Sequence, residues 1–225
     1  MTEASDRRAR DLQGQARAAL APHGLLCLGW LALEETDEGS GRALLIGNVG
    51  PSLWPAFQSS PEAEDGAPDP MNRWTRAALA PLARELGAQV RFPFDRPFFP
   101  FQRYARLATG MEPSPLGLAI HPEYGLWVAL RGLLVWAEET FALPPRRPTY
   151  RPCDRCPDKP CLDTCPVDAF DGASYAVERC RTHVRGPDTG ACAGRGCAAR
   201  RACPVGAGFA YEEAQQRFHM KAFLG

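Results

Sequence analysis

The stretch "CDRCPDKPCLDTCP", from Cys153 to Pro166, carries four cysteines and ends in a Cys-Pro step. A second stretch, "CRTHVRGPDTGACAGRGCAARRACP", runs from Cys180 to Pro204 and ends in the same step. Their spacings are C-x2-C-x4-C-x3-C-P and C-x11-C-x4-C-x5-C-P. Eight of the nine cysteines of this 225-residue chain therefore lie in its last third, and they decide how that third can fold.

The rest of the composition is that of an ordinary globular chain, with 45% hydrophobic and 23% charged residues. The formal net charge is zero, which gives no reason to expect nucleic acid or an anionic membrane as the partner. The sequence contains no run typical of a signal peptide or a membrane span, so we expect a cytoplasmic protein. Thiols stay reduced in that compartment, so clustered cysteines are expected to bind metal.

The two Cys-Pro steps favour iron–sulfur clusters. In bacterial two-cluster ferredoxins, the run C-x2-C-x2-C-x3-C-P supplies three ligands to one cluster, and its fourth cysteine binds the other cluster. Three closely spaced thiolates wrap one face of a cluster, while the fourth begins the next turn and points away. The sequence therefore predicts two 4Fe–4S clusters with crossed ligands: Cys153, Cys156, Cys161 and Cys203 form the first group, and Cys180, Cys192, Cys197 and Cys165 form the second group.

Other uses of the eight thiols remain open. Two zinc sites, or one cluster and one zinc, would use the same thiolates. Zinc has no preference for a Cys-Pro ending, and the C-x2-C pair typical of zinc sites occurs here only once. Disulfides are the remaining alternative. The ninth cysteine, Cys27, lies in the apolar run "LLCLGWLAL" and is interpreted as a core residue.

The order of helical and strand patterns favours the α+β class. The apolar runs at 25–33 and 42–50 predict a hairpin. A helix is expected from the capping residue Asp69 to Gly87, kinked at Pro81. The other expected elements are a helix at 5–21 capped by Ser5 or Asp6, turns at 34–41, a polar loop at 58–69, a strand at 88–94, a helix at 99–109, one or two strands within 116–139, and a helix at 212–224 that packs back through Phe218 and Phe223.

Four parts are expected along the chain. Residues 1–143 form an α+β domain, and the proline-rich "PPRRPTYRP" at 144–152 is a semi-rigid linker. Residues 153–206 form the two-cluster domain, and residues 207–225 form the C-terminal helix.

An aromatic, arginine-bearing segment stands out in the N-terminal domain. It comprises "FPFDRPFFPFQRYARLATG" at 92–110 and "HPEYGLWVALRG" at 121–132. Such residues can form the floor of a binding site for a broad planar cofactor. Alternatively, they are aromatic residues of the core with arginines capping them. No dinucleotide or phosphate-binding glycine motif is present, so direct hydride exchange with a nicotinamide is not expected.

These segments resemble two known families. "FPFQRYAR" followed by "HPEYGLWVALRGLLV" is similar to the cobalamin-processing decyanases of the CblC type. "VERCRTHV" and the paired cysteines resemble the cluster domain of epoxyqueuosine reductases. The resemblance implies a nitroreductase-like α+β domain that binds a corrinoid, joined to a small ferredoxin-like domain with two 4Fe–4S clusters. The chain lacks the "GWIGK" type of segment of epoxyqueuosine reductases, so activity on transfer RNA is not expected.

The resemblance also implies which residues face the cofactor. Tyr104 or His121 could donate a proton, although a buried tyrosine or a histidine before proline equally serves the fold. The residues expected to line the corrinoid cleft are Phe101, Gln102, Arg103, Tyr124, Gly125, Trp127 and Arg131.

The sequence leaves four functions to compare. The leading hypothesis is a redox protein whose clusters pass electrons to cobalamin, as a cobalamin-dependent reductase or a cobalamin-processing factor. A flavodoxin or ferredoxin would donate the electrons, and the acceptor would be the corrinoid or a small-molecule substrate. The alternatives are a two-cluster ferredoxin serving a protein partner, a flavin-binding iron–sulfur reductase, and a zinc-bound interaction module.

Overall fold

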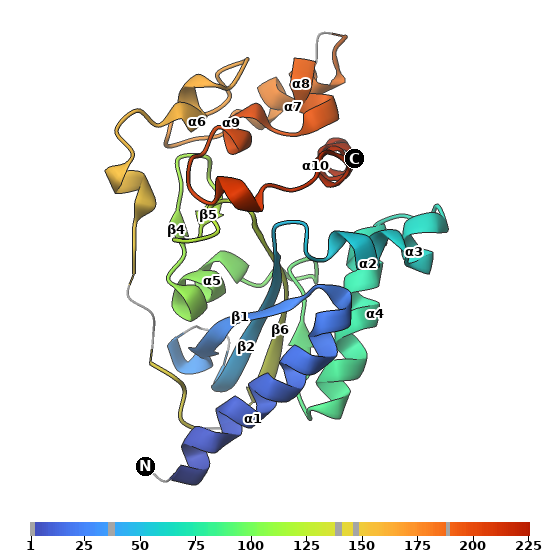
Figure 1. Cartoon of the computed structure of the whole chain (residues 1–225), viewed down its shortest axis with the longest axis vertical. Helices are drawn as coiled ribbons and strands as arrows, with labels where there is room; N and C mark the ends of the chain where they lie inside the picture. The colour runs from blue at the N-terminus through green and yellow to red at the C-terminus, as the bar shows by residue number, and fades with distance from the viewer. Residues whose placement is uncertain (1–2, 36–38, 138–140, 146–148, 188–189) are drawn as a thin grey trace. The chain divides into compact units, whose positions relative to one another are not determined.

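The computed structural model describes residues 3–35, 39–137, 141–145, 149–187 and 190–225 (Figure 1). The chain forms two compact units. The first unit comprises Met1–Gly110 and Ala129–Pro148, and the second comprises Met111–Val128 and Thr149–Gly225. Helices and strands are mixed along the chain, as the α+β class requires.

A four-stranded sheet in the order β1-β2-β6-β3 is the centre of the first unit. The predicted hairpin is confirmed: β1 (Leu26–Ala32) pairs antiparallel with β2 (Gly41–Val49). Residues 36–38 of the expected turns between them lie outside the described residues. β3 (Gln89–Arg91) pairs antiparallel with β6 (Val128–Ala137), so the strands expected at 88–94 and within 116–139 also form.

Helices cover both faces of this sheet at β1 (Figure 1). The Trp30 indole donates a 2.9 Å hydrogen bond to Gln13 of α1 (Glu3–Leu20), whereas the neighbouring Gly29 lies against the Ala108 carbonyl of α5 (Phe101–Thr109). Successive residues of a strand point to opposite faces, so α1 and α5 pack on opposite sides. α1 buries Leu12, Ala16 and Leu20 as its spacing predicts.

The predicted start of α1 at Ser5 or Asp6 is wrong, because the helix begins at Glu3. Glutamate and alanine are good helix formers, so residues 3 and 4 extend the helix.

α4 (Pro70–Glu85) confirms the second predicted helix and buries Met71, Trp74 and Leu82. Pro81 lies inside it, and Gly87 follows its end. Asp69 occupies the N-cap position, but the expected capping bond is absent: its side chain makes no cap hydrogen bond, and its backbone is left-handed with φ 52°.

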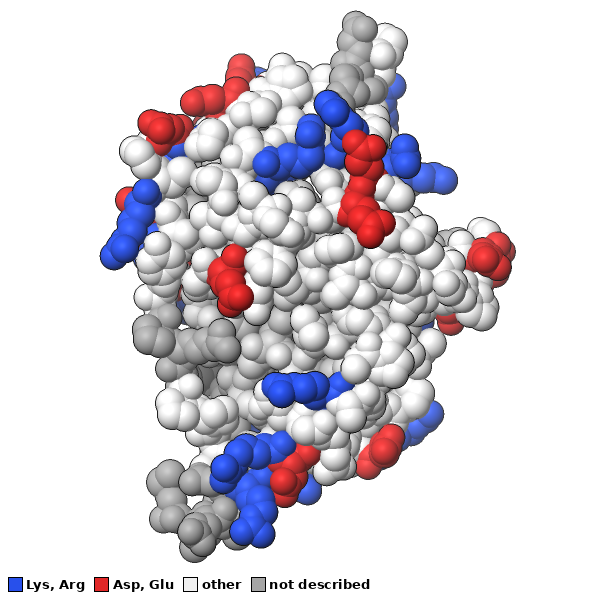
Figure 2. Space-filling model, in the orientation of Figure 1, with Lys and Arg blue, Asp and Glu red and all other residues white. Residues whose placement is uncertain are grey.

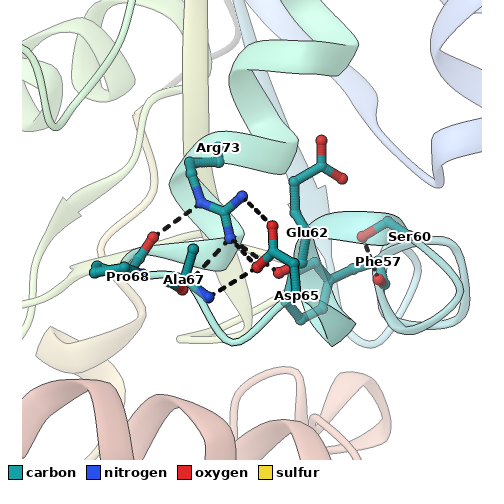
Figure 3. A network of polar contacts seen from close by, with 7 residues as sticks. All are labelled: Phe57, Ser60, Glu62, Asp65, Ala67, Pro68 and Arg73. Atoms are coloured by element: carbon teal, nitrogen blue, oxygen red, sulfur yellow. Dashed lines mark hydrogen bonds and ion pairs between the residues drawn. The ribbon is translucent and has the colours of Figure 1, made fainter.

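The loop before α4 is fastened by Arg73 instead (Figure 3). The Arg73 guanidinium pairs with the Asp65 carboxylate at 2.6 Å and donates to the carbonyls of Pro68 and Glu62. The Arg73 hydrogen bond is the main cause that lowers the pKa of Asp65. The region predicted as a polar loop at 58–69 therefore carries ordered contacts, and it contains the end of α2 (Trp54–Gln58) and all of α3 (Pro61–Glu64).

The second unit is built from short elements. β4 (Glu112–Pro113) and β5 (Ala119–Ile120) form a small hairpin, and short 3-10 turns lie at Pro152–Arg155 and Ala207–Phe209. The helices are α6 (Pro160–Asp163), α7 (Val177–Arg185), α8 (Gly190–Arg195), α9 (Ala198–Arg201) and α10 (Glu213–Leu224).

One apolar cluster forms the core of the second unit. Leu116, Ile120 and Leu126 pack there with buried cysteines of both groups. Residues 111–128, which the sequence analysis assigns to the N-terminal domain, thus supply side chains to the core around the cysteines. The predicted C-terminal helix is confirmed as α10, and the Phe223 ring lies 6.4 Å from the Tyr175 ring.

The predicted linker at 144–152 is described only in part, because residues 146–148 lie outside the described residues. At its end, the exposed Arg151 forms a 3.3 Å ion pair with the buried Glu112. No helix in the described ranges is long and apolar enough to cross a membrane. Charges of both signs are interspersed on the face seen in Figure 2.

Candidate functional site

The first group of cysteines is brought together in the second unit. Burial is the main cause that raises the pKa of Cys153 to about 11, and the charges of Cys203, Cys161 and Cys156 contribute to this shift. The pKa of Cys161 is likewise raised by burial and by Cys203 and Cys156. The electrostatic effect of one thiolate on another falls off with distance. The four cysteines predicted as the first group, Cys153, Cys156, Cys161 and Cys203, therefore lie close together.

The second group is brought together in the same way. Burial raises the pKa of Cys197, and Cys192, Cys180 and Cys165 add to the shift. These four cysteines line one small cavity of about 20 Å³, which is partly open to solvent. Its other walls are mostly apolar, including Val167, Phe170, Ala198 and Met220.

Two short helices place one cysteine of each stretch beside the cysteines of the other stretch. α6 carries Cys161 and ends just before Cys165, and α9 lies between Cys197 and Cys203. α6 and α9 pack against each other. Each cysteine that follows one of these helices therefore meets the group formed by the other stretch.

Backbone and side-chain donors point at several of the sulfur atoms. The Ala169 N–H donates to Cys165 Sγ at 3.3 Å. Backbone hydrogen bonds from Leu162, Arg200 and Val205 to the sulfurs of Cys161, Cys197 and Cys203 act to lower the pKa of those thiols, although burial outweighs them. Donors of this kind stabilise thiolates and are typical of the surroundings of metal-bound sulfur.

The first group lies beside two hollows of the second unit. The larger, about 960 Å³ and open to solvent, is lined by Cys156, Tyr150, Arg155 and several prolines, among them Pro122 and Pro204. The smaller, about 470 Å³, is bounded by Cys153 and by the Arg151–Glu112 pair. No three His, Cys, Asp or Glu side chains in the described ranges lie close enough together to hold a single metal ion.

Cys27 is separate from both groups and lies half-buried on β1. Burial raises its pKa to about 11, and the nearby charge of Arg17 opposes this shift only in part. Cys27 is therefore a protonated thiol at neutral pH.

This shift predicts a pH dependence of stability for the first unit. Between pH 9 and pH 11 the Cys27 thiol ionises in the unfolded chain but stays protonated in the folded chain. Its contribution is complete below pH 9 and is lost as the pH rises through 11. From pH 8 to pH 11 the free energy of unfolding should fall by about 2 kcal/mol more in the wild type than in Cys27→Ala. Denaturant unfolding followed by tryptophan fluorescence measures both; an equal fall would contradict the burial of this thiol.

Five of the predicted cofactor residues belong to the first unit. On α5, Phe101 and Tyr104 are buried with their rings 5.4 Å apart, and the Tyr104 hydroxyl accepts a 3.4 Å hydrogen bond from Arg91. Gln102 is exposed and Arg103 is half-buried. On β6, Arg131 is buried and donates from Nε to Asn48 Oδ1 at 3.0 Å. Gln102 and Arg103 are thus the most accessible members of this set, and the proton-donor role of Tyr104 stays a prediction.

The other four predicted residues belong to the second unit, where His121, Tyr124 and Gly125 form one tight turn. His121 and Gly125 exchange two backbone hydrogen bonds of 2.9 and 3.0 Å. His121 Nδ1 accepts the backbone N–H groups of Glu123 and Tyr124, and the His121 and Tyr124 rings stack 4.4 Å apart. Because Nδ1 is an acceptor here, the neutral ring carries its proton on Nε2.

The fourth residue, Trp127, is 1% exposed. Its ring packs against Tyr211 at 5.2 Å and under the Arg200 guanidinium at 4.5 Å. Arg200 also donates to the Leu126 carbonyl at 2.6 Å. In this arrangement Trp127 anchors the helix that separates Cys197 from Cys203. The sequence analysis missed this role of Arg200, because the pattern "AARRAC" does not distinguish it from Arg201.

Two substitutions of His121 separate a structural role from a chemical one. Asparagine can present an acceptor where Nδ1 lies, whereas alanine cannot. We expect His121→Ala to lower the free energy of unfolding by about 1–3 kcal/mol and His121→Asn to recover most of this loss. Thermal unfolding of both variants measures the difference. Equal destabilisation by both would show that the Nδ1 contacts do not hold the turn.

No family model and no curated protein matches the sequence. Among solved structures, the chain is similar to the C. elegans B12-trafficking protein CblC, a homologue of human MMACHC, with a TM-score of 0.59 and 14% identity over 96% of this chain and 92% of that one. Epoxyqueuosine reductase from Bacillus subtilis matches with a TM-score of 0.46 and 16% identity. A complex of epoxyqueuosine reductase with a tRNA-Tyr stem loop matches at 0.47 and 17%.

In both comparisons with the reductase, 80% of this chain aligns with 52% of the other, so the chain spans about half the length of those proteins. The similarity to the B12-trafficking protein extends over nearly the whole of both chains. At this level of identity it establishes the fold. The resemblance that the aromatic motifs predict is thus confirmed, and the protein has a CblC-like α+β fold.

Proposed function

We propose that this protein is a redox protein in which two 4Fe–4S clusters of the second unit pass electrons to a corrinoid held by the CblC-like fold. The observation that carries the proposal is that the eight cysteines fall into two groups of neighbouring thiols, in which one cysteine of each stretch lies beside three cysteines of the other stretch. The reaction would be reduction of the corrinoid itself, as in cobalamin processing, or of a small substrate by the reduced corrinoid.

The chemistry of the donors supports the clusters. Each group offers four sulfur ligands, and the four sulfurs of the second group line one small cavity. N–H donors lie against sulfurs of both groups, which favours thiolates and tunes a cluster's potential. Bound clusters would supply one-electron relays. We propose that residues 153–206 hold them in the ferredoxin manner.

The fold supports the corrinoid. One solved structure that matches nearly the whole chain is that of a B12-trafficking protein. Among the residues predicted to line the cleft, Gln102 and Arg103 of the first unit are accessible to solvent. An amide and a guanidinium can hydrogen-bond the amides and phosphate at the edge of a corrinoid. Phe101 and Tyr104 of the same unit are buried and would support such contacts from behind.

An external donor completes the proposed route. Clusters exchange one electron at a time, so a flavodoxin or a ferredoxin is the kind of partner expected. The half-exposed Cys156 borders the open hollow, which brings the first group near the surface of the second unit.

One metal inventory tests the proposal. The full chain is purified without oxygen from cells supplied with iron and cobalamin, and iron, sulfide, zinc, cobalt and flavin are counted per chain. We expect about eight irons, about eight sulfides and one cobalt. Eight irons with neither cobalt nor flavin would leave a two-cluster ferredoxin. Released flavin would establish the flavin alternative, and zinc without iron would overturn the redox function.

A further inference from the structure

One face of α7 lines the small cavity that the four cysteines of the second group share. Cys180, His183 and Val184 stand at positions i, i+3 and i+4 of this helix, so they lie on one face, and all three line the cavity. The helix packs against α8, which carries Cys192, and against α10, which carries Met220 of the same cavity. The fold therefore holds the His183 ring in the wall of this cavity.

His183 brings a polar donor group to an otherwise apolar and sulfur-lined space. Among the lining residues in the described ranges, His183 alone has a nitrogen or oxygen atom in its side chain. The ring is half-buried, but its Nε2 atom is fully buried and has no hydrogen-bond partner within the described residues, the cysteine sulfurs included. A buried polar atom without a partner is destabilising, so Nε2 calls for an acceptor other than the protein's own groups.

The inorganic sulfides of an iron–sulfur cluster are acceptors of this kind. A 4Fe–4S cluster bound by Cys165, Cys180, Cys192 and Cys197 would bring its sulfides among the side chains that line the cavity. Sulfide is negatively charged and accepts hydrogen bonds without donating any. It would select the form of the His183 ring in which Nε2 carries a proton, and a ring nitrogen in that form is a donor.

We propose that His183 donates a hydrogen bond from Nε2 to an inorganic sulfide of the second cluster and so raises the reduction potential of that cluster. The inference rests on the proposed function, since it concerns a cluster held by the second group. The electron comes from the external donor, and its addition makes the cluster more negative without making or breaking a bond. A donated hydrogen bond stabilises the more negative state more strongly, so it favours reduction.

A dithionite titration of the anaerobically purified full chain, followed by electron paramagnetic resonance, measures the effect on the potential. His183→Leu removes the donor, whereas in His183→Gln the amide N–H can take the place of the ring Nε2–H. We expect two midpoints in the wild type, a negative shift of one of them in His183→Leu, and recovery of most of this shift in His183→Gln. Thr182→Leu is the matched control, because Thr182 is exposed on the same helix and does not line the cavity. Both midpoints should be unchanged in that variant.

Pulsed electron paramagnetic resonance of the reduced protein detects the hydrogen bond itself. All four histidines are labelled with nitrogen-15, and the coupling of this nucleus to the reduced clusters is recorded. We expect a weak coupling in the wild type, as a hydrogen-bonded nitrogen gives, and its loss in His183→Leu. A strong coupling, as an iron-bound nitrogen gives, would make His183 a ligand and overturn its role as a donor. The labelled wild type needs no substitution, so this measurement stands even where a variant does not fold.

The outcomes separate this inference from the function on which it rests. A wild type without iron would contradict the clusters and, with them, the role of His183. About eight irons, the same midpoints in the wild type and His183→Leu, and no nitrogen-15 coupling would overturn the role of His183 alone.

Discussion

Replacing Cys153 and Cys203 together by alanine should remove about four of about eight irons, no more than either substitution alone. The two residues lie 50 positions apart, but they belong to the same group of neighbouring thiols. Replacing Cys153 and Cys165 together should instead remove both clusters, although these residues share one short stretch. The reason is that Cys165 completes the group formed by Cys180, Cys192 and Cys197.

Iron and sulfide per chain, with the number of paramagnetic species after reduction, measure this difference. Cys27→Ala is the control and should keep all of the iron, because Cys27 lies apart from both groups. If the Cys153/Cys165 double variant kept one intact cluster while Cys153/Cys203 lost both, the stretches would bind their clusters without exchanging a ligand.

Substituting Gly125 or Gly206 by alanine is expected to have the largest effect on the fold of the second unit. Both residues have positive φ, 59° and 68°. A Cβ on Gly125 would lie 1.8 Å from the Val205 carbonyl oxygen, and one on Gly206 would lie 2.3 Å from the backbone of Tyr124. The backbone of the turn at 121–125 thus contacts the backbone just after Cys203. Rotation of a side chain cannot make room for an added Cβ there, so the backbone itself would have to move. We expect each variant to lose about 4 kcal/mol or more of stability and the iron of the first group.

Gly117→Ala is the matched control for these variants. Gly117 also has positive φ, 71°, and lies in the same unit, but a Cβ there meets no atom within 4 Å. The Gly117→Ala variant should lose only about 1–2 kcal/mol of folding stability, because of backbone strain at positive φ, and it should keep about eight irons. Iron content and thermal unfolding compare the three variants. Equal behaviour of Gly125→Ala and Gly117→Ala would show that the turn does not support Cys203.

The elements that the sequence predicted well are those that local patterns specify. The hairpin of β1 and β2 follows from two apolar runs, and α4 follows from Met71, Trp74 and Leu82 on one face. The predicted capping hydrogen bond of Asp69 was wrong because the ion pair between Arg73 and Asp65 holds this loop instead. Such a pair produces no repeating pattern in the sequence, so it could not be predicted. The similarity to CblC proteins could be inferred because the aromatic motif is long and unusual.

The candidate site was predicted less evenly. The Cys-Pro steps predict a division of the eight cysteines into two sets, and the thiols that influence one another lie within these sets. Which cysteines bind a cluster stays a prediction. The segment "HPEYG" was read as part of a cofactor cleft, and whether it contacts a cofactor stays a prediction. Its contact with Val205 and Gly206 joins residues 80 positions apart, and only the folded chain reveals it.

Single-turnover electron transfer tests the central claim most directly. The two-cluster protein is reduced, freed of reductant and mixed without oxygen with hydroxocobalamin, while absorbance follows the clusters and the corrinoid. We predict that each electron lost by the clusters appears as one cobalt reduced from the trivalent to the divalent state, at a rate that saturates with cobalamin concentration. Saturation reports a bound complex and separates the protein from a ferredoxin that reacts by collision. Clusters that stay reduced beside an unchanged cobalamin spectrum would contradict the account.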